Sequence, residues 1–459
     1  MDKKKRNKLI IFAVVTVLAI VLAVIEPFAG LDRKGMIFLG IFIWWLMMMI
    51  VELIPAYMSC LAALMIAVAA KCGDTATALN AFAGTTVWLL IGAFGLATAL
   101  VNSGFLNRLA LNIMRLFPGT YTGQLLGLSA ASLVVAPCIP STTAKCTILV
   151  PIAGVISDKL GFEKNSKGAL GLFHTVNVLT NMGGCIFMTG GVVVGIMIAT
   201  AGASFTWFGW LKFALIWGVV LIALTILYSL FFCKPTEAKK VTKEDLKAMV
   251  DELGPMNKKE KSALIILVAT ILAWMLESVH GIPTYAVAII AWILMAACGL
   301  FSMADLMTKI LWPIVLQVGG ILGVITLLGT TGVSAWISSF VAPVVSAVSG
   351  TPVLVIAIVS ILSSAMMFAM IQGPVSCAVF VALLAGSSIS PICVALAALI
   401  SAQVFVFEFQ LPTVLAAEGV YNGRIDHKTY SKCGWVYIVC NLVALIASVP
   451  YWSMIGLIG

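Results

Sequence analysis

Long, uninterrupted apolar stretches determine which solvent this chain can fold in. Hydrophobic residues make up 62% of its 459 residues and charged residues only 10%, against roughly 25% charged residues in a soluble domain. The stretches run for about 17 to 25 residues, the length of a helix that crosses a bilayer core, and they do not alternate as barrel strands do. The sequence therefore predicts an all-α polytopic membrane protein.

Two of the apolar stretches, 124–157 and 352–388, are interrupted near the middle by small polar clusters, 139–146 and 371–377. Backbone that is not helical at membrane depth persists only where it is buried in protein or lines a wet cavity. A matched pair of broken segments, one in each half, is typical of the binding site of a secondary transporter. We therefore interpret the chain as a solute carrier whose site lies at these two tips.

The order of the stretches predicts a topology. If both broken stretches are re-entrant hairpins, the chain makes about 11 crossings. Most of its 27 lysines and arginines then lie on the cytoplasmic side with the N-terminus, as the positive-inside rule requires. The C-terminus lies outside, and the chain is a multi-pass inner-membrane protein. The predicted units are a signal-anchor helix (1–34), a first repeat (35–233), a charged cytoplasmic linker (234–261) and a second repeat (262–459).

The two halves share a spaced pattern of small residues. Gly92, Gly95, Leu100 and Gly104 recur at the same spacing as Gly320, Gly323, Leu328 and Gly332. An odd number of crossings separates the copies, so they would be inverted repeats, the arrangement that permits alternating access to a midplane site. The alternative is that these glycines only let helices pack closely.

Three regions of the sequence resemble the divalent anion/sodium symporter family: 86–94 with 103–108, Ser141–Ala144 followed by Val150-Pro151-Ile152, and Phe409–Pro412. This resemblance implies a carrier of di- or tricarboxylates or sulfate that forms a homodimer and works by elevator movement of a transport domain against a scaffold. It also implies that the hairpin tips hold the substrate carboxylates and sodium, and that the helix break after each hairpin completes a sodium site.

The tips depart from the family's Ser-Asn-Thr motif. The first reads Ser141-Thr142-Thr143 without the Asn, and the second reads Gln372-Gly373-Pro374. Side-chain oxygens for sodium are therefore missing, and a residual sodium site is expected only near Ser141 and Gly183. No cofactor is expected, and the coupling ion is sodium or a proton. The predicted substrate-binding residues are Ser141, Thr142, Thr143, Lys145, Gln372, Gly373, Pro374 and Ser376, and the predicted helix-break or ion-coupling residues are Gly183, Gly184, Glu408, Pro412 and Thr413.

Lys145 lies just beyond the first tip, and a charge at such depth is by default a functional-site hypothesis. Its ammonium would replace the charge of a sodium ion or contact a substrate carboxylate. The alternative is a lysine that pairs with Glu408 or extends to the cytoplasmic face. Glu408 itself would carry a coupled proton if it is desolvated, or would face water at a helix end.

His174, Asn177 and Asn181 share a helical face that leads to the Gly183-Gly184 break. They would line a vestibule or, as the preferred interpretation, satisfy backbone groups at the break.

Other classes of function fit poorly. The chain has only 3 histidines, none of them in a His-Glu-x-x-His pattern, and no nucleophile with a base beside it, which argues against an enzyme. No repeated filter motif supports a channel, and no basic stripe interleaved with aromatic residues suggests nucleic acid. We expect exchange or proton-coupled transport of C4-dicarboxylates or related di- and tricarboxylates. The alternatives are a sodium-coupled dicarboxylate or sulfate symporter and a gluconate or citrate carrier.

Overall fold

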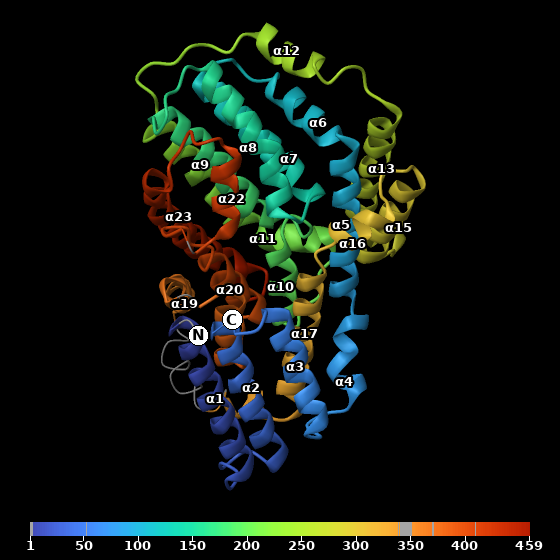
Figure 1. Ribbon diagram of the computed structural model, residues 1–459, viewed down its shortest axis with the longest axis vertical. Coiled ribbons are helices and arrows are strands. Elements are labelled where there is room, and N and C mark those ends of the chain that lie inside the picture. Colours follow the sequence, from blue (N-terminus) through green and yellow to red (C-terminus); the bar gives the residue numbers. More distant parts are fainter. Residues whose placement is uncertain (1–2, 52, 338, 340–350, 370, 409) are drawn as a thin grey trace.

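A computed structural model describes residues 3–51, 53–337, 339, 351–369, 371–408 and 410–459 of the chain. Helices are the regular elements of these residues (Figure 1). The first half contains α1 (Lys3–Val24), α2 (Arg33–Val51), α3 (Ala56–Ala69), α4 (Thr75–Leu79), η1 (Asn80–Ala83), α5 (Thr85–Ser103), α6 (Phe105–Met114), α7 (Tyr121–Val135), η2 (Ala136–Cys138), α8 (Thr142–Lys159), α9 (Lys167–Asn181), η3 (Gly183–Ile186), α10 (Val192–Thr200) and α11 (Trp207–Phe231).

The linker between the halves contains α12 (Lys243–Asp251). The helices after it are α13 (Lys258–Met275), α14 (Glu277–His280), α15 (Thr284–Ala297), α16 (Met303–Thr308), α17 (Trp312–Thr330), α19 (Pro352–Phe368), α20 (Gly373–Leu383), α21 (Pro391–Ser401), α22 (Pro412–Val420) and α23 (His427–Met454). In Figure 1, α12 lies at one end of the long axis, and α1, α2 and α3 lie towards the other.

Among the described helices, 7 are long and apolar enough to cross a membrane, and several shorter apolar helices accompany them. The prediction of an all-α polytopic membrane protein is confirmed. Each broken stretch is a pair of helices joined by a tip: α7 and α8 in the first half, α19 and α20 in the second.

Local sequence explains where the helices of the first hairpin end. Pro137 lies in the short helix η2, and Ile139 is extended, so the α7 helix does not continue into α8. Helix α8 begins after Ser141, whose side-chain oxygen accepts a hydrogen bond from the Ala144 amide at 3.3 Å. In the second hairpin, α20 begins with Gly373-Pro374 after the extended residue Gln372, and Pro occupies a position near the helix start where no amide hydrogen is needed.

Helices of one half pack crosswise on helices of the other. Helix α5 contacts α15, where a Cβ at Gly92 would lie 3.1 Å from the Cβ of Ala288. The corresponding helix α17 contacts α3, where a Cβ at Gly323 would lie 3.0 Å from Leu64. In the same way α8 contacts α22 and α10 contacts α20. Reciprocal pairs of this kind are what an internal two-fold relation between halves produces.

The linker is anchored to the first half by two ion pairs. Lys159 of α8 bonds Asp245 of α12 at 2.7 Å, and this hydrogen bond is the largest of the causes that lower the pKa of Asp245 to about 2. Arg108 of α6 bonds both carboxylate oxygens of Glu260, at 2.8 and 3.2 Å, and both side chains are buried. Glu260 also closes a capping box with Asn257 at the start of α13.

We predict that Glu260→Ala lowers the thermal stability of the detergent-solubilised protein, because it leaves the Arg108 guanidinium buried without its carboxylate. Removal of one partner of a buried pair costs about 3 kcal/mol, so the apparent melting temperature should fall by several degrees. The double variant Arg108→Met with Glu260→Met should regain part of the loss. Glu252→Ala, a change at an exposed residue of the same linker, is the control. An unchanged melting temperature for Glu260→Ala would contradict the prediction.

Candidate functional site

Lys145 connects the first hairpin tip to the first helix break. Its side chain is fully buried in the first turns of α8. The ammonium donates a hydrogen bond of 2.6 Å to the carbonyl oxygen of Gly190, in the loop between η3 and α10. Thr189 of the same loop donates to the carbonyl oxygen of Pro137 at 2.7 Å, so a second bond joins the loop to the tip.

The glycines of this break make room for the lysine. A Cβ on Gly184 would lie 2.9 Å from the Lys145 Nζ and 3.0 Å from the Gly190 carbonyl oxygen. A Cβ on Gly190 would overlap the carbonyl oxygen of Gly184. Gly183 instead faces Leu179 and Ile222, so of the two adjacent glycines it is Gly184 that borders the ammonium.

No carboxylate neutralises Lys145 in the part of the chain that the structure describes. Its electrostatic neighbours are the thiols of Cys138, Cys146 and Cys185, contributed by η2, α8 and η3. The lysine also lies in the N-terminal turns of α8, where the helix dipole is positive. The first tip therefore carries two sources of positive potential, and the described residues place no compensating negative side chain beside it, which favours an anion there.

A cavity of about 420 Å³ opens on one side of this tip, and we call it the first-tip cavity. Ser141 and Thr143 line it from the tip, and Thr98 and Asn102 line it from α5. Its volume is within the range of small-molecule sites. Lys145 does not line it and lies behind the tip, so its contact with Gly190 fits the role of a fixed cation better than direct contact with substrate in this conformation. Thr142, between the lining residues, is half-buried.

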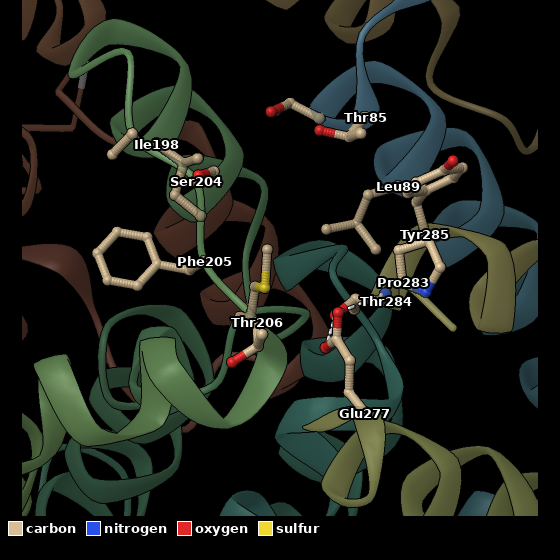
Figure 2. A pocket seen from close by; sticks show the side chains of 13 residues that line it. Thr85, Leu89, Ile198, Ser204, Phe205, Thr206, Glu277, Pro283, Thr284 and Tyr285 are labelled. Carbon is tan, nitrogen blue, oxygen red and sulfur yellow. Dashed lines mark hydrogen bonds between the residues drawn. The ribbon is translucent and has the colours of Figure 1, made fainter. Parts of the chain in front are cut away.

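A second cavity, of about 330 Å³, lies towards the other end of α5, and we call it the opposite cavity. Figure 2 shows it between Thr85 and Leu89 of α5 and the segment from Ile198 to Thr206. A small cavity of about 20 Å³ lined by Pro140 and Thr189 lies between the two. The first tip and the break thus separate two cavities that share α5 as a wall.

The second tip is more closely packed. A Cβ on Gly373 would lie 2.9 Å from Leu399 of α21, and the buried Ser376 hydroxyl donates to the Gly373 carbonyl oxygen at 2.9 Å. Gln372 is exposed and Pro374 is half-buried. Among the described residues, none of the second tip lines the first-tip cavity, so the joint substrate site stays a prediction.

The second helix break contains several polar groups. Glu408 is exposed on the loop before α22, so the alternative in which it pairs with Lys145 is wrong for the described residues. The Thr413 hydroxyl is buried without a hydrogen-bond partner among them. Pro412 is the first residue of α22, and the neighbouring Phe409 lies outside the described residues. Glu418 of α22 bonds His427 of α23 at 2.9 Å, a pair that the sequence did not suggest.

His174, Asn177 and Asn181 form a buried polar cluster and do not line a vestibule in this structure. The Asn177 amide donates to the Tyr430 hydroxyl at 2.7 Å, and the Asn181 amide donates to the Asn177 backbone carbonyl at 2.9 Å. The preferred interpretation, that they satisfy backbone groups at the break, fits the Asn181 bond alone. The Asn177 amide bonds a side chain, and the His174 Nδ1 is buried without a hydrogen-bond partner among the described residues.

Sequence reasoning missed the scaffold side of the first-tip cavity. Asn102 of α5 and the adjacent pair Thr308 and Lys309 at the end of α16 line it. Asn102 immediately precedes the matched patch 103–108, but a lone Asn near a helix end carries no signal of its own. Charge counting places Lys309 on the cytoplasmic side with most of the other basic residues and gives it no role in binding.

The fold and the site define a polytopic carrier in which broken helices surround the buried ammonium of Lys145. Residues 4–458 match the sodium:sulfate symporter transmembrane region family, and the chain belongs to this family. It is a membrane transporter and not an enzyme, as the sequence predicted. The predicted resemblance to divalent anion/sodium symporters is confirmed.

Three relatives are similar to this chain over more than half of its length. The inner membrane protein YbhI of Escherichia coli (strain K12) is 27% identical over 356 residues, 72% of this chain and 73% of the relative. The putative malate transporter YflS of Bacillus subtilis (strain 168) is 25% identical over 63% of this chain and 62% of the relative. Dicarboxylate transporter 1, chloroplastic, of Spinacia oleracea is 24% identical over 69% of this chain and 58% of the relative.

Solved structures support the fold alone. The YdaH transporter of Alcanivorax borkumensis aligns with a TM-score of 0.58 and 13% identity over 99% of each chain. MtrF of Neisseria gonorrhoeae gives the same TM-score and identity over 97% of this chain and 94% of its own.

We predict that Gly190→Ala abolishes transport while the protein still inserts in the membrane, because the added methyl group displaces the loop that holds the Lys145 ammonium. Gly419→Ala is the matched control, because a Cβ at Gly419 in α22 would meet nothing within 4 Å. Uptake of labelled succinate by proteoliposomes checks both variants, with membrane content measured by immunoblot. Normal uptake by Gly190→Ala would show that this loop geometry is not required.

Proposed function

We propose that this protein is a secondary active carrier of small divalent anions, with C4-dicarboxylates as its substrates, and that it exchanges one anion for another across a bacterial inner membrane. The observation that carries the proposal is the buried Lys145 ammonium, hydrogen-bonded to the Gly190 carbonyl oxygen and without a carboxylate partner among the described residues. A charge buried without a partner costs several kcal/mol. A dianion bound at the tip would offset that cost.

The same charge favours exchange. A coupling ion such as sodium leaves with the substrate, and the empty carrier can then return without its charge. The Lys145 ammonium is covalently attached, so a return without substrate would move an uncompensated cation through the low-dielectric interior. A second anion on the return path avoids this cost, which makes transport depend on counter-substrate.

Crosswise packing supports an elevator mechanism. Helices α8 and α22 contact each other, as do α10 and α20, so the hairpins and broken helices of both halves form one packed unit. The unit borders α5 along the row of cavities. We propose that it slides along α5 and α15 as the transport domain, with a homodimer as the fixed frame. Proton coupling through the Glu418–His427 pair is the second mode, favoured by the burial of both side chains between the end of α22 and the start of α23.

Flux measurements in proteoliposomes separate these modes. We expect uptake of labelled succinate or malate to require an internal dicarboxylate and to be unchanged when sodium replaces choline outside. Uptake that depends steeply on sodium and needs no internal anion would overturn the exchange mode and support a sodium-coupled dicarboxylate or sulfate symporter. Labelled citrate, gluconate and sulfate, tested in parallel, identify the anion class.

We predict that Lys145→Ala lowers exchange about a hundredfold, the cost of removing the charge partner of a buried anion. Lys261→Ala, at an exposed lysine of α13, is the control. Added methylammonium should restore part of the exchange, because a small ammonium ion can occupy the space that the lysine leaves. Exchange by Lys145→Ala at the wild-type rate would remove the lysine from the site, and loss without rescue by any small cation would assign it a packing role.

A further inference from the structure

The two cavities on either side of the first tip carry opposite charges. Among the described residues that line the first-tip cavity, Lys309 of the α16 end is the charged one. Among those that line the opposite cavity, Glu277 of α14 is the charged one (Figure 2). An anion therefore meets an attractive potential on one side of the tip and a repulsive one on the other.

Lys309 is available to bind an anion. It is exposed, and no ion pair within 4 Å joins it to another described residue. Asp305, four residues earlier, is near enough to interact electrostatically with Lys309 without forming an ion pair within 4 Å. Its carboxylate is engaged in the capping box of α16, where it accepts bonds from the Ser302 amide at 2.8 Å and the Ser302 hydroxyl at 2.7 Å.

Glu277 is held in place by hydrogen bonds and not by a cation. The Thr284 hydroxyl donates to its carboxylate at 2.6 Å, and the amides of Thr284 and Trp207 donate at 3.2 Å each. Figure 2 shows the carboxylate turned towards Thr284 at the wall of the opposite cavity. These three donors fix the Glu277 side chain at the wall of the opposite cavity, so an acidic residue lines that cavity.

We propose that Lys309 is a capture residue for the anionic substrate that acts from one side of the membrane only. One carboxylate of the substrate would approach the hydroxyls of Ser141 and Thr143 at the α8 N-terminus while the other faces Lys309 across the cavity. This inference rests on the proposed function, because it assumes that a small dianion enters here.

The sidedness follows from the elements involved. Ser141 and Thr143 belong to the hairpin, whereas Lys309 follows α16, next to the scaffold helices α15 and α17. When the hairpin moves, the distance between the tip and Lys309 increases. The lysine therefore assists binding only in the conformation that opens on its side. Lys145, by contrast, travels with the tip and serves both sides.

The test compares substrate affinity on the two faces of the membrane. Labelled succinate uptake is measured in intact cells and in everted membrane vesicles that carry the full-length protein. Cys298, at the end of α15 just before α16, is the exposed one of the 11 cysteines. Its labelling by an impermeant maleimide identifies the preparation in which the α16 side faces the medium.

For Lys309→Gln we expect KM to rise about tenfold in the preparation that exposes Cys298 and to stay within about twofold in the other, with the maximal rate unchanged. Lys309→Arg should retain the wild-type KM. The difference between wild type and Lys309→Gln should shrink in 0.5 M potassium chloride, because added salt screens an exposed charge. Lys259→Gln, at an exposed lysine that does not line this cavity, is the control.

The outcomes separate this inference from the function on which it rests. Wild-type exchange with an unchanged KM on the α16 side for Lys309→Gln, or with an equal rise on both sides, would overturn the capture role and leave the exchanger intact. A wild-type protein that transports no dicarboxylate in either preparation would overturn the proposed function, and this inference with it.

Discussion

The buried ammonium of Lys145, bonded to the Gly190 carbonyl oxygen, is the interaction on which the arrangement of the first tip depends. It holds the α7–α8 tip against the loop after η3, and the glycines of that loop leave room for it. A charge in this position is costly unless something compensates it, and among the described residues only backbone dipoles and thiols surround it. A negatively charged substrate at the tip is the compensation that the architecture allows. In the proposed mechanism the carrier needs an anion in both directions of movement, so transport takes the form of exchange.

The helices around the first tip form the unit that we propose to move together with Lys145. Contacts of α8 with α22 and of α10 with α20 tie the hairpins and broken helices of both halves together. The bidentate ion pair of Arg424 with Asp158, at 2.6 and 2.8 Å, adds a polar tie between the end of α8 and the loop after α22. Helix α5 borders this unit. It packs closely on α15, because Gly92 and Gly95 face α15. The cavities that α5 lines lie at the boundary along which the proposed movement would occur.

Much of this could be predicted from the sequence, because hydrophobic length and helix-breaking residues act locally. The apolar stretches predicted the spans, and proline and glycine at 140, 183, 184, 373 and 374 marked breaks that the structure contains. Lys145 was identified as unusual because any charge at that depth is. The partner of Lys145 could not be predicted, because a backbone carbonyl at residue 190 leaves no trace in residue type. Lys309 and the Glu418–His427 pair were missed for a related reason: their roles come from tertiary packing between segments that no periodicity connects.

The affinity of the solubilised protein for a C4-dicarboxylate, measured by calorimetric titration as sodium replaces choline, tests the central claim most directly. The account predicts the same Kd at zero and at 100 mM sodium for the wild-type protein, since the lysine already supplies the positive charge. A Kd that falls about tenfold for each tenfold rise in sodium would mean that a bound cation is required. That result would contradict the claim that Lys145 stands in its place.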